Sequence, residues 1–333
     1  MTNLSAQDLE ADMISVPKVS VVMNAMNGDP WIDECIQSVL AQTLQDFEFI
    51  IINDGSTDGT WQKINSYQDP RIRAFTQTNI GIAASANRGI SLARAPYIAR
   101  IDQDDVMLPT RLEKQLAFLD ANPDVAFVCT FAQLIYEFEL SEDYYRAPIS
   151  SNALRLRLVF ENPVVQPSVM MRTSLVTALG SYDESPELYS AQDFELWTRL
   201  ALNNSVGTIP EALTRYRVRR NSVSHSLKSI DHNVIISANF LHALLKDQCT
   251  RAECFSLAQI FHRATGPVEP LSQRRALWMF DRVADLIAGP RNEWDAEIKS
   301  VYALQRRMIF FHHILRRQLF RPFIQRFQAL RLR

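Results

Sequence analysis

Three carboxylates stand within four positions in the segment Ile101-Asp102-Gln103-Asp104-Asp105, which ends the apolar run that begins at Tyr97. Like charges held this close repel, so they stay ionised in a folded site only when a cation or a dense hydrogen-bond network compensates them. Carboxylate oxygens suit Mg²⁺ or Mn²⁺, and Mg²⁺ is often bound by one or two carboxylates together with substrate phosphates. The alternative is a solvated acidic turn that caps the helix beginning near Pro109, and this segment alone favours neither interpretation.

The turn Asn53-Asp54-Gly55-Ser56-Thr57-Asp58-Gly59 is a second candidate site, because it follows another apolar run at 47–52. Gly55 can adopt a positive φ, Ser56 or Asp58 can cap the next helix, and the N-terminus of that helix favours an anion. Taken alone, the segment indicates an ordinary capped turn. Together with the acidic segment downstream, it indicates nucleotide binding.

A third cluster extends from Asn79-Ile80-Gly81 to Asn87-Arg88-Gly89, along a predicted helix that is rich in small residues. Its two asparagine amides could exchange hydrogen bonds with a base, ribose or phosphate. Close packing of the helix on a sheet explains the glycines equally well. Neither G-x-G-x-x-G nor G-x-x-x-x-G-K-[ST] occurs, which disfavours dinucleotide and P-loop binding.

Asp193 begins an amphipathic helix in the segment Gln192-Asp193-Phe194-Glu195-Leu196-Trp197. An acidic side chain in the first turn gains from the helix dipole, and this structural role is the commoner one. The alternative is a general base that takes a proton from a nucleophile. Glu195 is the competing carboxylate for that role.

Apolar, β-rich segments alternate with helical patterns through the first half of the chain. This alternation predicts βαβ units, and therefore a doubly wound, mainly parallel α/β sheet with helices on both faces. Ligands of such sheets bind beyond the carboxyl ends of the strands, where the polar clusters lie, Asn24 to Asn27 included. Strands are predicted at 19–23, 47–52, 72–75, 97–101 and 125–131, and helices at 31–42, 60–67, 83–93 and 110–121.

The alternation breaks down between residues 136 and 190, where loops, a helix at 154–160 and a strand at 168–171 are predicted. A helix at 193–202 and a strand at 212–218 follow, and from about residue 227 the pattern is helical only. We therefore predict an N-terminal extension at 1–17, an α/β domain at 18–226 with halves at 18–130 and 131–226, and a helical region at 227–333.

A chain of 333 residues with 47% hydrophobic residues is long enough for one large domain or two ordinary ones. Its net charge of −2 argues against nucleic-acid binding. The four cysteines form no C-x-x-C pair and the chain has no signal-peptide-like start, so we expect reduced thiols and a cytoplasmic protein. The longest apolar stretches fall short of the roughly 20 residues that span a bilayer.

The last segment, 305–333, carries eight arginines and no acidic residue, with large apolar residues at helical spacing. This combination favours a helix that lies on an anionic lipid surface, which would hold the protein peripherally on the cytoplasmic face of a membrane. The alternative is that the apolar stripe packs on the body of the protein or on the second subunit of a homodimer.

Taken in order, these motifs resemble family 2 glycosyltransferases of the GT-A fold, of the type that builds bacterial cell-surface polysaccharides. The resemblance covers roughly residues 18–226. It is carried by Q-T-x-x-D-F-E-x-I-I-x-x-D-G-S-T-D-G at 42–59, by I-D-x-D-D-x-x-L-P-x-R-L-E-K-Q-L-x-F-L at 101–119, and by the segment 192–200.

The resemblance implies a nucleotide-diphosphate sugar as donor, with UDP favoured, and a glycan or lipid-linked acceptor. In the family the loop after the first strand and the turn after the second hold the base, and the first aspartate of the acidic motif meets the ribose. The candidate donor-binding residues are Asn24, Asn27, Asp54, Asn79, Gly81, Asn87, Asp102, Arg217 and Arg219.

The resemblance also implies Mn²⁺ or Mg²⁺, with Asp104 as the metal ligand and Asp105 as a second candidate. Asp193 matches the catalytic base of the family. It would deprotonate the acceptor hydroxyl for an in-line attack that inverts the anomeric carbon, while the metal stabilises the departing diphosphate.

The chain departs from the family pattern at several positions. Gln166 and Arg219 stand where histidine is frequent, so either fewer protein ligands hold the metal, or Arg217 or Arg219 neutralises the diphosphate directly. Asn24-Ala25-Met26-Asn27 replaces Pro-Thr-Tyr-Asn, which removes an aromatic contact near the base. A non-catalytic nucleotide-sugar-binding or scaffold protein is therefore an alternative. A sugar nucleotidyltransferase is less favoured, because no glycine-rich, lysine-bearing phosphate loop follows the first strand.

Overall fold

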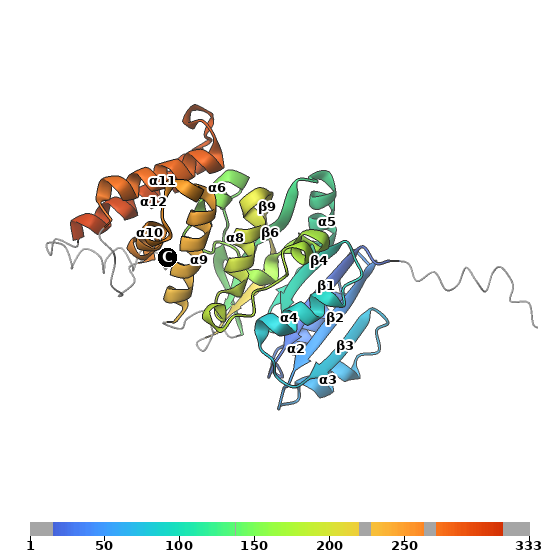
Figure 1. Cartoon of the computed structure of the whole chain (residues 1–333). Helices are drawn as coiled ribbons and strands as arrows, with labels where there is room; N and C mark the ends of the chain where they lie inside the picture. Colours follow the sequence, from blue (N-terminus) through green and yellow to red (C-terminus); the bar gives the residue numbers. More distant parts are fainter. Residues whose placement is uncertain (1–15, 137, 220–227, 263–270, 316–333) are drawn as a thin grey trace, which may run out of the picture.

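The computed structural model describes residues 16–136, 138–219, 228–262 and 271–315. In these ranges nine strands form one mixed sheet in the order β3-β2-β1-β4-β8-β6-β9-β5, and β7 pairs with β6 (Figure 1). The strands are β1 (Val19–Ala25), β2 (Phe47–Asp54), β3 (Ile72–Gln77), β4 (Tyr97–Asp102), β5 (Val106–Met107), β6 (Val125–Tyr136), β7 (Glu139–Tyr145), β8 (Met170–Arg172) and β9 (Ser205–Val218).

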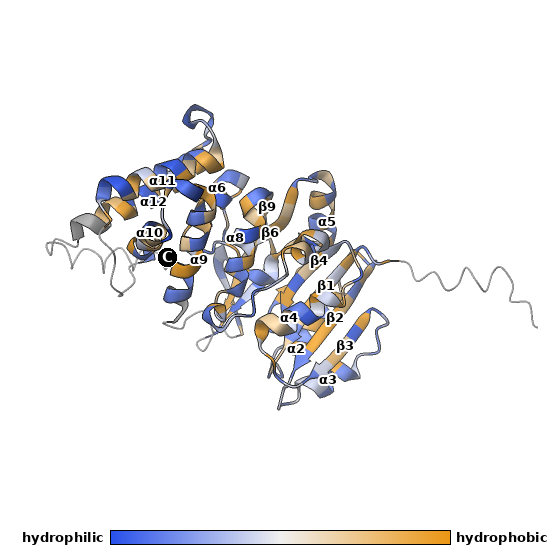
Figure 2. Cartoon of the chain, in the orientation of Figure 1, coloured by the Kyte–Doolittle hydropathy of each residue, from blue (hydrophilic) through white to orange (hydrophobic). Residues whose placement is uncertain are grey.

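Both faces of β1, β2 and β4 are buried, which is why their sequences are largely apolar (Figure 2). In β1, Val21 and Met23 belong to one core cluster and Val22 to another, because successive side chains of a strand point to opposite faces. One face is covered by α2 (Ile32–Leu40), α3 (Thr60–Ser66) and α5 (Arg111–Ala121), and the other by α4 (Ile82–Ser91) and α8 (Gln192–Asn203). The predicted α/β architecture with helices on both faces is confirmed.

The sheet is parallel from β3 to β4 and in the long ladder of β6 with β9. Strand β8 is antiparallel to both β4 and β6, and β5 and β7 are antiparallel edge additions. Strands β5 and β7 were not predicted, because β5 has only two residues and β7 is exposed and polar, without the apolar alternation of a core strand. The helix predicted at 154–160 is α6 (Ser151–Arg157), and a short helix, α7 (Thr173–Ala178), follows β8.

Four helices follow: α9 (Lys228–Leu245), α10 (Arg251–His262), α11 (Gln273–Ala288) and α12 (Ala296–Leu315). They lie at the end of the molecule opposite β3 (Figure 1), and their buried side chains continue the core cluster of α4, α6 and α8. Phe160, just after α6, stacks on Phe261 of α10 with ring centroids 4.2 Å apart. The predicted boundary at 226 lies outside the described residues.

Only the beginning of the basic segment 305–333 is described. There Gln305 and Ile309 are buried and Arg306 pairs with Asp281 of α11 at 3.0 Å, so this part packs on the body of the protein. The remaining arginines, from Arg316 onward, lie outside the described residues. Within the described ranges, no helix combines the length and apolar character needed to cross a membrane.

Gly89 lets α4 pack closely on β1, since a Cβ added there would lie 2.5 Å from Val22 Cγ1. Alanine would gain about 1 kcal/mol of helix propensity, but overpacking against a stiff valine costs about 1–3 kcal/mol. We expect Gly89→Ala to lower the free energy of unfolding by about 1 kcal/mol in urea titrations. Ser91→Ala, exposed on the same helix, is the control, and a Gly89→Ala protein as stable as the wild type would contradict this packing.

Candidate active site

The carboxyl ends of β1, β2 and β4 bring the first polar clusters to one edge of the sheet. Asn24 lies in register with Asp102 of β4, and Ala25 with Asn53 of β2. Asn24 Nδ2 donates to the carbonyl oxygen of Ile82 at 2.9 Å, while its buried Oδ1 has no hydrogen-bond partner among the described residues. Because an unpaired buried acceptor costs free energy, this oxygen is suited to a donor group of a ligand.

The loop after β1 is held in place by side chains from two other segments. Gln103 accepts the N–H of Met26 and donates to its carbonyl oxygen, both at 2.8 Å. Asn27, at a φ of 53°, donates its N–H to Ser56 Oγ at 3.0 Å and accepts the N–H of Thr57 at 2.9 Å. Asn27 therefore joins this loop to the turn after β2.

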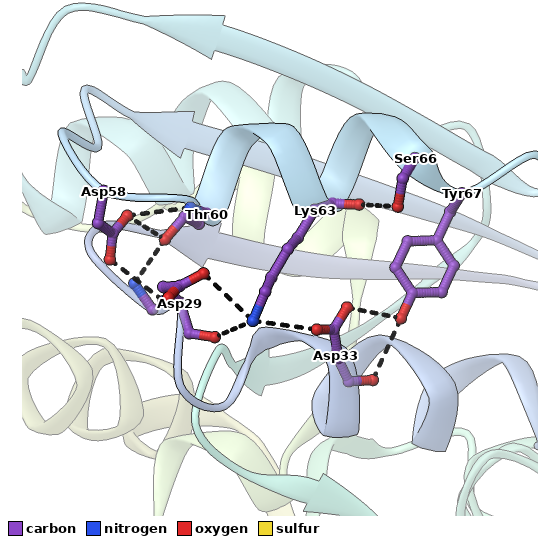
Figure 3. Close-up of polar contacts among 8 residues, drawn as sticks. Asp29, Asp33, Asp58, Thr60, Lys63, Ser66 and Tyr67 are labelled. Atoms are coloured by element: carbon purple, nitrogen blue, oxygen red, sulfur yellow. Dashed lines mark hydrogen bonds and ion pairs between the residues drawn. The ribbon is translucent and has the colours of Figure 1, made fainter.

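An ionic network fastens the same loop from the side of α3 (Figure 3). Lys63 Nζ lies 3.2 Å from Asp29 Oδ1 and 3.1 Å from Asp33 Oδ2. Asp58 accepts the N–H of Asp29 at 3.2 Å, and the hydroxyl of Thr60 accepts the N–H of Gly28 at 2.8 Å. The two loops thus form one pre-ordered unit.

Asp54 is buried and holds the loop that leads into α4. Its carboxylate accepts the N–H groups of Ile80 and Gly81 at 2.9 and 3.1 Å and the amide of Gln77 at 2.8 Å. Gly81 has a φ of 94°, which favours glycine. Asn79 Nδ2 contacts the carbonyl oxygen of Asp54 at 3.3 Å. The three candidates Asp54, Asn79 and Gly81 therefore lie together, with Asp54 as an organiser of the loop.

The acidic segment separates into three different environments. Asp102 is the most accessible, with a third of its side chain exposed, and it accepts a hydrogen bond from Gln166 Nε2 at 3.0 Å. Beneath it lies the fully buried Arg100, whose Nη2 is 3.9 Å from Asp102 Oδ1. Gln166 thus occupies the position of a frequent histidine and binds the aspartate directly.

Asp104 and Asp105 both interact with the end of β9. Asp104 Oδ2 pairs with Arg219 Nε at 2.7 Å, and Asp105 Oδ1 accepts the N–H of Arg217 at 2.7 Å. Burial raises the pKa of both carboxyls, most strongly that of Asp105, which is 1% exposed and also lies near the charge of Asp104. Arg217 donates to the carbonyl oxygen of Asp104 and to Glu34, so it links the acidic segment to α2.

Asp105 faces the interior, where its negative charge favours the protonated form of the buried Arg111. Its Oδ2 has no hydrogen-bond partner in the described part of the chain. No group of three or more His, Cys, Asp or Glu side chains is arranged there to hold a metal ion. Asp104 and Asp105 are neighbouring carboxylates, and Mg²⁺ is commonly bound in proteins by one or two carboxylates together with substrate phosphates.

Asp193 lies in the first turn of α8, on the side of the sheet that also carries Asp102. Burial raises the pKa of its carboxyl to about 6, and the negative charge of Asp102 adds to this shift. Opposing it, the N–H of Phe194 and the amide of Asn162, which donates to Asp193 Oδ2 at 2.9 Å, favour the ionised form. A carboxyl tuned in this way is suited to accept a proton near neutral pH.

The amino-acid sequence of the chain is similar to those of known proteins. The sequence model described as "Glycosyl transferase family 2" matches residues 20–173. The "Putative glycosyltransferase EpsE" of Bacillus subtilis is 32% identical over 227 residues, which cover 67% of this chain and 80% of that relative. The chain belongs to glycosyltransferase family 2. Its predicted enzyme class is thereby confirmed.

The fold of this glycosyltransferase is similar to those of solved structures. TarS of S. aureus in complex with UDP-GlcNAc superposes with a TM-score of 0.59 at 17% identity, over 89% of each chain. The mannosyltransferase PcManGT of Pyrobaculum calidifontis, in complex with GDP-Man and Mn²⁺, gives a TM-score of 0.53 at 15% identity, over 90% of this chain and 86% of that one. At these identities the likeness concerns the fold, and the predicted GT-A architecture is confirmed.

Two side chains of the predicted motifs, those of Asn87 and Glu195, form contacts that stabilise the structure of the glycosyltransferase. Asn87 exchanges two hydrogen bonds of 2.9 Å with the backbone of Tyr182 and donates to Glu184, so it holds a loop. Glu195, the competing carboxylate, forms an ion pair with Arg199 at 2.6 Å. This leaves Asp193 as the first-turn acid available for chemistry.

Two contributors to the site were missed in the sequence. Gln103 stands at a variable position of the acidic motif, yet it holds the loop after β1. Asn162 lies in the poorly patterned segment between 136 and 190 and contacts Asp193 across 31 positions. The only local signal was the amide itself, because such a contact depends on tertiary structure.

Proposed function

We propose that this glycosyltransferase moves a sugar from a nucleotide-diphosphate donor, with UDP favoured, to a hydroxyl of a glycan or lipid-linked acceptor, with inversion at the anomeric carbon. The observation that carries the proposal is the meeting of Asp102 and Asp193 on one side of the sheet, close enough for the charge of Asp102 to raise the pKa of Asp193. In this proposal Asp102 binds the donor and Asp193 removes the proton of the acceptor.

In the proposed reaction, Asp193 takes the proton of the acceptor hydroxyl. The hydroxyl oxygen then forms a bond to the anomeric carbon, while the bond from that carbon to the diphosphate oxygen breaks. Asn24, with its unpaired Oδ1, and the unit built by Asn27 and Asp54 would hold the nucleoside. The guanidinium groups of Arg217 and Arg219 supply positive charge at the edge where the diphosphate would lie.

The acidic segment fits a divalent cation. Asp104 would hold Mn²⁺ or Mg²⁺ after releasing Arg219, and the buried Asp105 would support it from behind or act as a second ligand. When bound, such an ion stabilises negative charge on a departing diphosphate. The Mn²⁺ and nucleotide sugars bound in the two solved relatives support this assignment. Assembly of a polysaccharide and peripheral membrane contact through 305–333 are further parts of the proposal.

A panel of nucleotide sugars tests the donor class. A true donor stabilises the native state by mass action, so we expect a UDP-sugar to raise the melting temperature, and more so with Mn²⁺ present. Product formation is then followed as release of the nucleoside diphosphate. No rise in melting temperature and no turnover with any nucleotide sugar would refute the proposed reaction.

The pH dependence tests the base. Because Asp193 must be ionised and its pKa is raised to about 6, we expect log kcat to fall by about one unit per pH unit below pH 6 and to level off above it. The measurement is kcat at saturating donor from pH 4.5 to 9, with circular dichroism to confirm that the fold persists. A flat profile across pH 6 in a folded enzyme would argue against Asp193.

A further inference from the structure

Asn162 makes a contact with Asp193 whose direction is fixed by its surroundings. Its Nδ2 donates to Asp193 Oδ2 at 2.9 Å. Its Oδ1 accepts the N–H of Val164 at 3.2 Å, so the amide cannot turn over without losing that bond. The carbonyl oxygen of Asn162 accepts a hydrogen bond from the hydroxyl of the half-buried Tyr145 at 2.9 Å. Strand β7, an exposed and polar edge strand, thereby anchors the loop that carries Asn162.

We propose that Asn162 is a positioning residue that aims the carboxylate of Asp193 and keeps it ionised at neutral pH. This inference rests on the proposed function, in which Asp193 is the base. An amide N–H can only donate, so it binds the ionised carboxylate and offers nothing to a proton on the same oxygen. Val164 holds the side-chain amide of Asn162 and Tyr145 holds its main-chain carbonyl oxygen, so the orientation of the base is set before an acceptor arrives.

Several other titratable groups face Asp193. Among the described residues these are Asp102 from β4, Tyr145 from β7, Tyr182 from the loop before α8, and Tyr216 from β9. Burial raises the pKa of all three tyrosines, so they stay protonated throughout the range in which Asp193 titrates. Burial also raises the pKa of Asp104 and Asp105, so the role of Asn162 is read from the displacement of the acid limb between wild type and variant, which share these two carboxyls.

Two substitutions test the role. Asn162→Ala removes the donor, and we expect the acid limb of log kcat to move up by about one pH unit, so that kcat falls about fivefold at pH 6 and stays within about twofold of the wild type at pH 8.5. Asn162→Asp places a second carboxylate against the base, so the limb should move further in the same direction. Recovery at alkaline pH separates this effect from simple misfolding.

Asn204→Ala is the matched control, because Asn204 lies just past the other end of α8, where its side chain donates to the carbonyl oxygen of Leu200 at 2.9 Å. It should leave the acid limb in place. An unmoved limb in both Asn162 variants would overturn the inference, provided that Asp193→Asn is inactive. Full activity of Asp193→Asn would instead remove the proposed function on which the inference rests.

Discussion

Replacing Asp193 by asparagine is expected to lower kcat by about 10²–10⁴-fold, the usual contribution of a positioned general base. Asparagine has nearly the same shape but cannot take the acceptor proton. Because Asp193 is proposed to act on the acceptor, the donor should still stabilise the variant against thermal unfolding. The measurement is kcat at saturating donor and acceptor at pH 7.5, beside a melting curve with and without donor.

Glu195→Gln is the matched control for this experiment. It removes a carboxylate from the same helical turn, but one that is paired with Arg199 at 2.6 Å. We expect a loss of stability without a loss of transfer of comparable size. Equal losses of kcat in the two variants would mean that the charge at the start of α8, and not a base at Asp193, matters for the reaction.

The second large effect is expected at Asp104. Asp104→Asn should lower kcat/KM by about 100-fold or more, because stabilisation of a departing diphosphate by a metal is worth several kcal/mol. The measurement is kcat/KM as a function of Mn²⁺ concentration, with chelation of the metal as the reference for complete loss. Added Mn²⁺ should restore the chelated wild type and leave the variant nearly unchanged.

Asp69→Asn controls for the loss of an aspartate that is paired with an arginine, since Asp69 contacts Arg71 at 2.7 Å near the amino end of β3. Arg219→Gln gives the complementary result: it frees the Asp104 carboxylate, so half-maximal activity should require less Mn²⁺. An Asp104→Asn enzyme with wild-type activity and an unchanged Mn²⁺ response would exclude Asp104 as the ligand.

The parts of the site that local sequence predicts are those that depend on a single strand end or helix start. Asn24, Asp54 and Asp102 each follow an apolar strand, and parallel strands bring their carboxyl ends to one edge. Asp193 is placed by the amphipathic pattern of α8. In each case the hydrophobic periodicity shows where the strand ends or the helix begins, so the position of the residue can be predicted from the sequence.

The supporting contacts are different, because they join segments far apart in the chain. Gln103 reaches Met26 across 77 positions and Asn162 reaches Asp193 across 31, and neither contact leaves a periodic signal. Strand β7 was missed for a related reason. It is an edge strand whose side chains are mostly exposed, so its sequence is polar and carries no apolar alternation. Tertiary register, and not local preference, decides these contacts.

Gln103 holds Met26 through its main chain alone, which leaves the side chain at position 26 open to change. Both main-chain groups of Met26 are engaged, while its side chain is 47% exposed. The path of the loop is thus independent of which side chain it displays. Under the proposed function, mutation at residue 26 would alter the surface offered to a nucleobase without refolding the loop, which makes this position a natural starting point for redesigning nucleotide choice.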